Sequence, residues 1–363
     1  MYQEPSGVRI MAYTTIDDSS AYFHIQLYVG NESTNAITNN ANAGNFQPDW
    51  WWGADRTSTS WNSVYDSSRG TTKQLNSNVN NSEYTVSTGL TSFDSDGFTL
   101  GSHDNSNGNS ENHVAWQWKA NGGTTASNTD GSITSTVQAN TTAGFSIVTW
   151  TGNGSTATIG HGLGATPQVV ILKSRDNAHD WFVAHNSMHS TPWVKYLTLH
   201  TTNGLADDVI WNDTAPTSTV FSVGNYASTN GNTVKFVAYC FAEVQGYSKF
   251  GSYKGNGSTD GPFAYTGFKP AWVMIKRSDN TSSWHMWDNK REDYEGNPND
   301  SALRADADGA ENDTTDYSID FLSNGFKLRN ASDLDNNSSG TFIYMAFAES
   351  PFVSSEGVPT TAR

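Results

Sequence analysis

The sequence predicts an all-β protein made of three tandem homologous β-sandwich domains. Three observations lead to this prediction. Uncharged polar residues take an unusually large share of the 363 residues, aromatic residues are also abundant (13 Trp, 15 Tyr and 17 Phe), and the chain repeats itself. Polar residues suit turns and outward strand faces, whereas aromatic residues favour strands and are scarce in disordered chains. No long stretch shows helical periodicity, so helix should be scarce.

Four sequence landmarks recur in one order in three copies. The first is a Gly-Asn turn, and the second is a proline followed within a few residues by a run of large apolar residues. The third is a hairpin with its second strand, and the fourth is a strand in which large residues alternate with smaller or polar ones. The spacing between copies is far too long for a solenoid repeat of about 20–50 residues, and it fits a small β-sandwich of roughly 100 residues. The copies of the four landmarks are 28–33, 150–155 and 253–258; 46–52, 166–171 and 268–274; 95–100, 221–223 and 323–328; and 114–118, 237–241 and 343–347.

The landmarks divide the chain into three domains and two connecting stretches. The expected parts are repeat 1 (1–119, with an N-terminal arm 1–12), a linker (120–131), repeat 2 (132–243), repeat 3 (244–349) and a C-terminal tail (350–363). Gly, Thr, Ser and Asn dominate the linker, which is the composition of a flexible connection. The second connection is short, so repeats 2 and 3 should pack more rigidly than repeats 1 and 2. Translation could begin at Met1 or at Met11.

The alternating strand has one face of large residues, which we expect to be buried in every copy. The opposite face of copy two is small and includes Cys240, which we interpret as a packed residue without a catalytic role. The run Trp50, Trp51 and Trp52 could form a carbohydrate platform, but valine and isoleucine stand in its place in copy two. We therefore expect a central strand that is covered on both faces.

Another strand should begin at a structural tryptophan in each copy, namely Trp61, Trp181 and Trp284. The dipeptides Asp96-Gly97 and Asn324-Gly325 are hairpin signals, because both residue types tolerate positive φ.

No motif in the sequence carries a recognisable catalytic mechanism, and no catalytic residue is predicted. Residues 160–164 (Gly-His-Gly-Leu-Gly) resemble part of a dinucleotide loop, but a proline and a strand follow where a helix should begin, so we expect an ordinary loop. The acidic residues are numerous, so no pair stands out as the two carboxylates of a glycosidase. No carboxylate recurs in all three copies, which argues against an enzyme but leaves open a site in one copy only.

Two patterns could bind metal ions, and neither predicts a metal site. His185 and His189 are spaced to share a helix face, but the first ends a predicted strand; two further histidines of the same repeat are His179 and His200. Residues 94–97 (Asp-Ser-Asp-Gly) begin like a calcium loop without its final Glu, and residues 306–309 are similar. Acidic turns explain both stretches, so no cofactor is predicted, and a structural Ca²⁺ stays open.

Composition excludes several classes of protein. The formal net charge of −16 argues against electrostatic binding to nucleic acid or to an anionic membrane. No apolar run approaches the roughly 20 residues that span a bilayer, and no secretory signal is visible at the N-terminus. The single cysteine, Cys240, excludes a disulfide within the chain.

Five segments of the chain are similar to a large group of virion-associated proteins from tailed, mainly marine, bacteriophages. This resemblance covers nearly the whole chain and implies a jelly-roll or concanavalin-like sandwich used as a tail, fibre or capsid-surface part. It implies no catalytic residue. The segments are SAYFHIQLYVGN, TSFDSDGFTLG, VAWQWKANGG, GHGLGATPQVVILKSR and FKPAWVMIKRSDN.

The resulting expectation is a non-enzymatic virion structural protein, displayed on the particle surface after assembly in the host cytoplasm, and acting as a tail fibre or adsorption protein. Its partners would be other virion proteins and further copies of itself, with a homotrimer as our guess. Capsid decoration is the alternative location. The alternative functions are a module that binds host glycans and, as the less favoured one, a polysaccharide-degrading enzyme. Candidate glycan-binding residues are the aromatics that break the internal pattern, namely Trp193, Trp211 and Tyr294.

Overall fold

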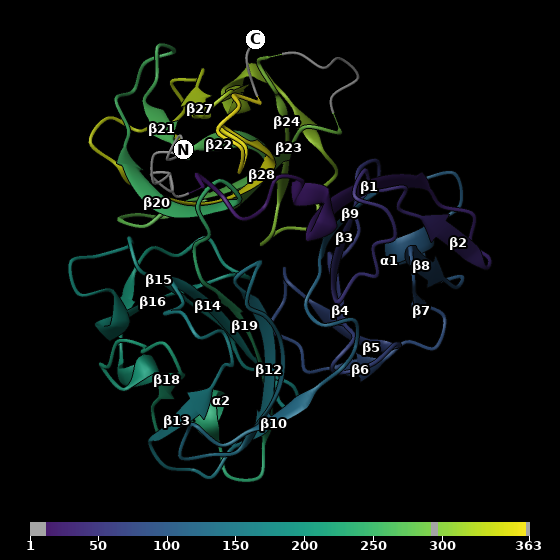
Figure 1. The fold of residues 1–363 in the computed structure, drawn as a ribbon, viewed down its shortest axis with the longest axis vertical. Coiled ribbons are helices and arrows are strands. Elements are labelled where there is room, and N and C mark those ends of the chain that lie inside the picture. Colours follow the sequence, from purple (N-terminus) through teal and green to yellow (C-terminus); the bar gives the residue numbers. More distant parts are fainter. Residues whose placement is uncertain (1–11, 292–296, 361–363) are drawn as a thin grey trace, which may run out of the picture.

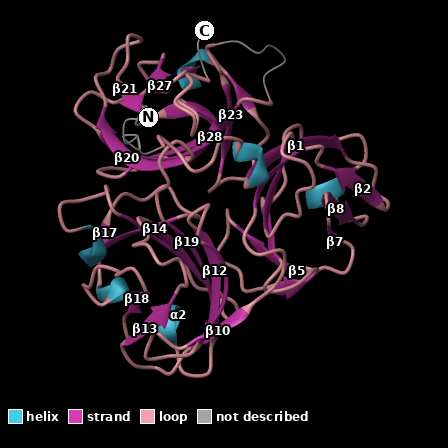
Figure 2. Cartoon of the chain, viewed as in Figure 1, coloured by secondary structure: helices cyan, strands magenta, loops and turns pink. Residues whose placement is uncertain are grey.

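The protein is all-β, as the sequence predicts (Figures 1 and 2). The computed structural model describes residues 12–291 and 297–360. Within these residues no helix is long and apolar enough to cross a membrane. The helices are all very short: η1 (Ser19–Ala21), α1 (Asp104–Asn107), η2 (Pro192–Val194), η3 (Val209–Trp211), α2 (Ala227–Asn230) and η4 (Thr315–Tyr317).

Three large sheets form the framework, one in each third of the chain. In spatial order, the first sheet contains β1 (Phe23–Val29), β9 (Asn112–Trp118), β3 (Trp50–Asp55), β4 (Ser63–Asp66), β5 (Lys73–Asn76) and β6 (Tyr84–Thr85). The second contains, in the same sense, β10 (Ala126–Asn128), β11 (Ser135–Asn140), β12 (Phe145–Thr151), β19 (Lys235–Phe241), β14 (Val169–Ser174), β15 (Trp181–His185), β16 (Lys195–Thr198) and β17 (Ala206–Asp207). The third contains β20 (Ser248–Lys254), β28 (Thr341–Pro351), β22 (Phe268–Arg277), β23 (Trp284–Asp288), β24 (Ser301–Arg304) and β25 (Asn312–Asp313).

Each large sheet has a small companion sheet drawn from the same third of the chain, and we call the two together a sheet pair. The order of the strands is the same in the three pairs with two exceptions: β10 and β11 extend the edge of the second large sheet, and the second small sheet has two strands where the other two have three. The small sheets are β2 (Asn35–Thr38), β8 (Gly97–Leu100) and β7 (Leu90–Asp94); β13 (Ala157–Gly160) and β18 (Val220–Val223); and β21 (Phe263–Tyr265), β27 (Gly325–Leu328) and β26 (Ile319–Leu322).

The central strands of each large sheet are buried on both faces, because one face packs on the small sheet and the other meets the remaining sheet pairs. In β28, Phe342 and Tyr344 belong to the local core of the third sheet pair, whereas Met345 and Phe347 belong to a core shared by all three. The large-residue face predicted from the sequence is therefore the one that joins the sheet pairs. The small-residue face, including buried Cys240, points to the small sheet, which explains its small side chains.

Three aromatic rings meet where the sheet pairs converge. They are the last large residues of the alternating strands: Trp118 of β9, Phe241 of β19 and Phe347 of β28. The ring centroids lie 6.4 Å apart for Trp118 and Phe241, 5.5 Å for Trp118 and Phe347, and 5.9 Å for Phe241 and Phe347. In Figure 1 the three sheet pairs form three lobes. One repeated position of the sequence thus builds the centre of the molecule.

The tryptophan run of β3 is buried on both faces, as predicted. Trp51 points to the small sheet and packs edge-on against Tyr65 and Phe98. Trp50 points to the shared core and stacks on Tyr239 of the second sheet pair, with centroids 4.5 Å apart. None of the run is available as a carbohydrate platform.

The predicted strand start at Trp61 is wrong: β4 begins at Ser63, and the alignment of Trp61 with the other two tryptophans is off by one residue. Asn62, and not Trp61, occupies the place that Trp181 and Trp284 hold in the other sheet pairs, because Ser63 pairs with Gly53 in the strand register. Trp61 is 38% exposed, whereas Trp181 and Trp284 are buried. The Asp96-Gly97 and Asn324-Gly325 turns connect hairpins as expected, and residues 161–164 form a loop.

The predicted linker 120–131 is anchored to both neighbouring sheets. Asp49 accepts hydrogen bonds from the backbone N–H groups of Ala120, Gly122 and Gly123, and β10 joins the edge of the second large sheet. Asp49 thus fixes the connection that glycine-rich composition predicts to be flexible.

Both ends of the described chain lie on the third sheet pair. The Tyr13 hydroxyl donates to the Gly267 carbonyl, and the Ser19 hydroxyl donates to the Glu349 carbonyl. In the predicted tail, the Ser355 N–H donates to Asp17. The first and last described segments of the chain therefore lie against each other.

Candidate functional site

The residues proposed from sequence as a glycan platform do not present open ring faces. Trp193 and Trp211 are both buried and pack edge to face, with centroids 5.9 Å apart, between η2 and η3. Sugar stacking needs an exposed ring, so the prediction fails at these two residues, which instead pack the loops of the second sheet pair. Tyr294 lies outside the described residues.

The histidines of the second sheet pair do not gather into one site. His185 is buried at the end of β15, and its Nε2 lies 3.0 Å from the Tyr344 carbonyl oxygen. His189 is exposed and contacts Thr191, while His200 lies 3.3 Å from Asp180.

The acidic stretches considered as calcium loops are structural turns. Asp94 accepts hydrogen bonds from Ser92 and Thr99 within its hairpin. Asp306 accepts the backbone N–H of Trp284. The carboxylates therefore stabilise their own loops and strand starts.

A different group of side chains forms the candidate site, and sequence reasoning missed it. Asp55 ends β3, Glu111 precedes β9, and His113 is the second residue of β9. The strand register places Asp55 directly opposite His113. One ligand atom from each of the three side chains lies within 4.8 Å of the others. This is the only group of three potential metal ligands found among residues 12–291 and 297–360.

Asp55 is buried and held in one orientation by the turn that follows it. Its Oδ1 accepts three hydrogen bonds: from the N–H of Thr57 (2.7 Å), the hydroxyl of Thr57 (3.1 Å) and the N–H of Ser58 (2.9 Å). Its Oδ2 has no hydrogen-bond partner among the described residues. One oxygen therefore fixes the carboxylate and the other is left for the cluster.

His113 is 1% exposed and stacks on Tyr28, with centroids 5.1 Å apart. In the described part of the chain, neither ring nitrogen makes a hydrogen bond. Burial lowers the pKa of His113 to about 4, against the opposing effect of the Glu111 charge. The imidazole is therefore neutral at pH 7, with a nitrogen lone pair free to bind.

Glu111 connects this buried pair to the surface. Its Oε1 accepts a hydrogen bond of 2.6 Å from the Ser58 hydroxyl, and its Oε2 lies 4.0 Å from His113 Nε2. The Asp55 carboxylate raises the pKa of Glu111, because the protonated form of Glu111 can donate a hydrogen bond to it, and burial adds to this effect. Gly108 leaves the space that the carboxylate occupies, since a Cβ there would lie 1.9 Å from Oε2.

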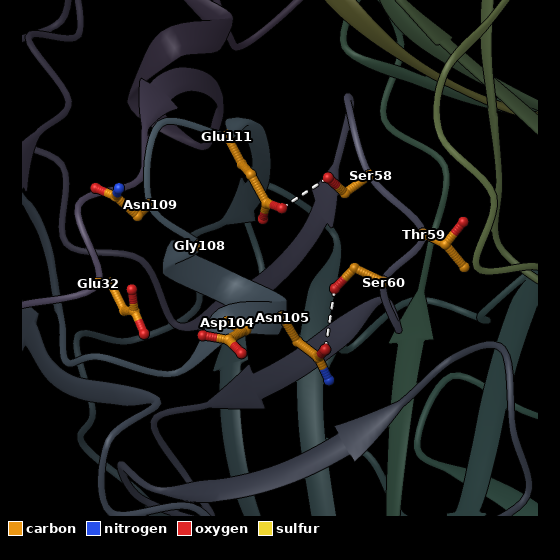
Figure 3. A pocket seen from close by; sticks show the side chains of 9 residues that line it. All are labelled: Glu32, Ser58, Thr59, Ser60, Asp104, Asn105, Gly108, Asn109 and Glu111. Carbon is orange, nitrogen blue, oxygen red and sulfur yellow. Dashed lines mark hydrogen bonds between the residues drawn. The ribbon is translucent and has the colours of Figure 1, made fainter.

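Glu111 lines a polar pocket of about 440 Å³ (Figure 3). Two hydrogen bonds join residues that line the pocket: the Ser58 hydroxyl donates to Glu111, and the Ser60 hydroxyl donates to Asn105. The pocket offers oxygen atoms and three carboxylates, so it suits a cation or a small polyol better than an apolar ligand. Its lining comprises Glu32, Ser58, Thr59, Ser60, Asp104, Asn105, Gly108, Asn109 and Glu111.

A signal for this site was present in the sequence. His113 immediately precedes the alternating landmark of copy one, and Phe236 and Phe342 hold the same place in the other copies. The first copy thus has a titratable residue where the other two copies have phenylalanine. Hydrophobic periodicity does not detect this difference, but an alignment of the three copies does.

Comparison with known proteins identifies a family and no function. A family model described as a domain of unknown function (DUF7483) matches residues 18–351. No curated protein and no solved structure matches the chain significantly.

Proposed function

Since the chain belongs to the DUF7483 family of domains of unknown function, we propose its role from its own residues: a non-enzymatic structural protein displayed on the surface of a bacteriophage particle. It acts as a tail-fibre or adsorption part and assembles with other virion proteins. Its three sheet pairs are three tandem homologous β-sandwich domains, of the jelly-roll or concanavalin-like kind that the sequence resemblance implies.

The common strand order and the four recurring landmarks support the three-domain interpretation. In each large sheet the alternating strand (β9, β19 or β28) lies between the strand that ends near the first landmark (β1, β12 or β20) and the strand of the second landmark (β3, β14 or β22). Duplication of one unit explains both the order and the landmarks. Independent origin would have to produce each of them three times.

The observation that carries the proposal is a closed ring of contacts between equivalent positions. Asp66, His185 and Asp288 all end the strand next to the central one, opposite Trp50, Val169 and Trp272 respectively. Each contacts the alternating strand of the next sheet pair. The three contacts are Tyr239 Oη to Asp66 (2.7 Å), His185 Nε2 to the Tyr344 carbonyl (3.0 Å), and Trp116 Nε1 to Asp288 (2.9 Å).

A second ring of contacts runs in the opposite direction. It starts from the residues that occupy the equivalent strand start, namely Asn62, Trp181 and Trp284. Each side chain donates to a carbonyl of a neighbouring sheet pair. The acceptors are Arg304 for Asn62 (2.8 Å), Asn76 for Trp181 (2.9 Å) and Thr198 for Trp284 (3.0 Å).

These two rings and the shared aromatic core make the chain a single body with no hinge between its sheet pairs. A part exposed on a particle must keep its shape without chaperones or a cellular environment, and a closed ring serves that need. An enzyme built on repeated sandwiches would instead be expected to keep a cleft at one junction. Between the first and third sheet pairs of this chain, Trp116 and Trp118 pack against Trp272.

The test is detection of the protein on intact particles. Antibody against the purified chain, labelled with gold, should decorate particles released from the host that carries the gene. Label on the tail supports the fibre role, and label over the head supports capsid decoration. Abundance in the lysate with no label on particles, and none of the chain in purified particles by mass spectrometry, would contradict the proposal.

A further inference from the structure

The three sheet pairs repeat one aromatic stack and differ in its chemistry. Strand registers place Trp150 opposite Phe236 and Tyr253 opposite Phe342, and both pairs are stacked, with centroids 5.3 Å and 5.1 Å apart. The equivalent stack in the first sheet pair is Tyr28 on His113. The imidazole thus replaces a phenyl ring at a buried site where apolar contact alone suffices for packing.

Two neighbouring positions change with it. In the first sheet pair, Asp55 lies opposite His113 in the strand register. The equivalent residues are Ser174 opposite Phe236 in the second sheet pair and Arg277 opposite Phe342 in the third.

At the loop position of Glu111, those sheet pairs carry Val234 and Gly340. The equivalence rests on one backbone contact that all three share, in which the carbonyls of Glu111, Val234 and Gly340 accept the N–H of Gly30, Gly152 and Gly255. All three departures from the repeat therefore meet at one point.

We propose that the first sheet pair binds one zinc-type divalent metal ion through Asp55 Oδ2, a ring nitrogen of His113 and Glu111 Oε2, with the remaining coordination position facing the polar pocket. This site goes beyond the proposed structural role and does not depend on it. The second and third sheet pairs lack it.

The set of donors favours a transition metal over calcium or magnesium. Calcium and magnesium prefer all-oxygen sites, whereas an imidazole among the donors suits zinc and other transition metals, and zinc also accepts carboxylate oxygens. Two ligands that each lie about 2.1 Å from one ion are roughly 3–4 Å apart. The distance of 4.0 Å between His113 Nε2 and Glu111 Oε2 is within that range. All the ligand atoms lie within 4.8 Å of one another, so the side chains must move closer by at most about 1 Å to bind one ion.

The surroundings already supply the outer contacts that metal sites use. Thr57 and Ser58 hold Asp55 by its other oxygen, and the Ser58 hydroxyl holds Glu111 by its other oxygen. Second contacts of this kind orient ligands before the ion binds. The pocket beyond Glu111 provides the path by which an ion enters.

The experiment uses the full chain, stripped with a chelator and dialysed, and titrated calorimetrically with ZnCl₂ and with CaCl₂ at pH 7.5. His113→Phe and Asp55→Ser introduce the residues of the second sheet pair at matched positions. Ser58→Ala removes an outer contact. His189→Ala, which alters an exposed histidine outside the cluster, is the control.

We expect the wild type and His189→Ala to bind one Zn²⁺ per chain and to retain it in elemental analysis after dialysis. His113→Phe and Asp55→Ser should lose about 100-fold or more in affinity, and Ser58→Ala about 10- to 100-fold. Wild-type protein that takes up no Zn²⁺, or takes up Ca²⁺ alone, overturns the proposal. So does Zn²⁺ binding by His113→Phe or Asp55→Ser at wild-type affinity; circular dichroism checks that each variant is folded.

Discussion

Two junctions between sheet pairs use equivalent positions of the fold, but one is built from charged side chains and the other from uncharged ones. Between the first and second sheet pairs, Arg69 pairs with Asp66 and with Glu83, and the Arg69 and Asp66 side chains are completely buried. Between the second and third, the equivalent places of Asp66 and Arg69 are taken by His185 and Met188, which are buried and uncharged.

The backbone of the two junctions is nevertheless the same. The Glu83 N–H donates to the Arg175 carbonyl at 2.7 Å, and the Leu205 N–H donates to the Ser278 carbonyl at 2.8 Å in the equivalent place. The ionic and the neutral junction therefore share this backbone contact, and we attribute it to the strand registers and aromatic core that the sheet pairs have in common. Buried ion pairs often add little net stability, but one partner without the other is costly.

The largest effect is expected from breaking the ionic junction. Arg69→Met leaves Asp66 buried without its cation, and we expect the free energy of unfolding to fall by about 3–5 kcal/mol. Denaturant unfolding, with the midpoint and slope compared to wild type, measures the loss. Lys249→Met, which removes a partly exposed partner of Glu243, should cost less than about 1 kcal/mol.

Converting one junction into the other tests the comparison itself. The double variant Asp66→His with Arg69→Met recreates the neutral pair of the other junction. It should regain most of the stability that Arg69→Met loses, because no unpaired charge remains. A double variant as unstable as the single one would show that the ion pair itself determines the geometry.

The neutral junction should in turn be sensitive to acid. Burial lowers the pKa of His185 to about 4, from an ordinary value near 6.5. Above pH 6.5 the residue is neutral in both states and has no effect on pH dependence. Between pH 6.5 and 4 the unfolded chain binds a proton that the folded chain does not, so stability falls by up to roughly 3 kcal/mol.

This acid sensitivity is measured as a difference between wild type and His185→Gln, unfolded in urea at pH 7.5 and pH 5. The wild type should lose more stability than the variant over that interval, since the other buried histidines contribute equally to both. Equal losses would mean that His185 does not govern the acid response of its junction.

A smaller effect is expected in the second ring. Trp284→Phe keeps the ring packing but leaves the Thr198 carbonyl without its donor across the junction. The expected cost is about 1–3 kcal/mol, from one unsatisfied buried acceptor and lost volume. Trp61→Phe is the matched control, because its partly exposed side chain lies one residue outside the ring; a similar cost there would contradict the equivalence of Asn62, Trp181 and Trp284.

Sequence reasoning predicted the features that depend on local pattern. Alternation identified the buried strands, the interchange of Trp50 with Val169 indicated a core position, and Asp-Gly and Asn-Gly located the hairpins. Each of these signals lies within a few residues of its structural consequence. The all-β class followed from the same patterns.

Features that depend on distant contacts were missed. Glycines made the connection after Trp118 resemble a flexible linker, because its anchor, Asp49, lies about 70 residues earlier in the chain. Tryptophan similarity aligned Trp61 where the fold uses Asn62. The Asp55 cluster escaped notice because its members match no motif and come together only through strand pairing.

Scanning calorimetry of the full chain tests the claim of a single closed body most directly. A closed body should show one unfolding transition, with a calorimetric enthalpy equal to the van't Hoff enthalpy, and Arg69→Met should move the whole transition to lower temperature. Two or three resolved transitions, or an Arg69→Met variant in which one part melts early and the rest is unchanged, would contradict it.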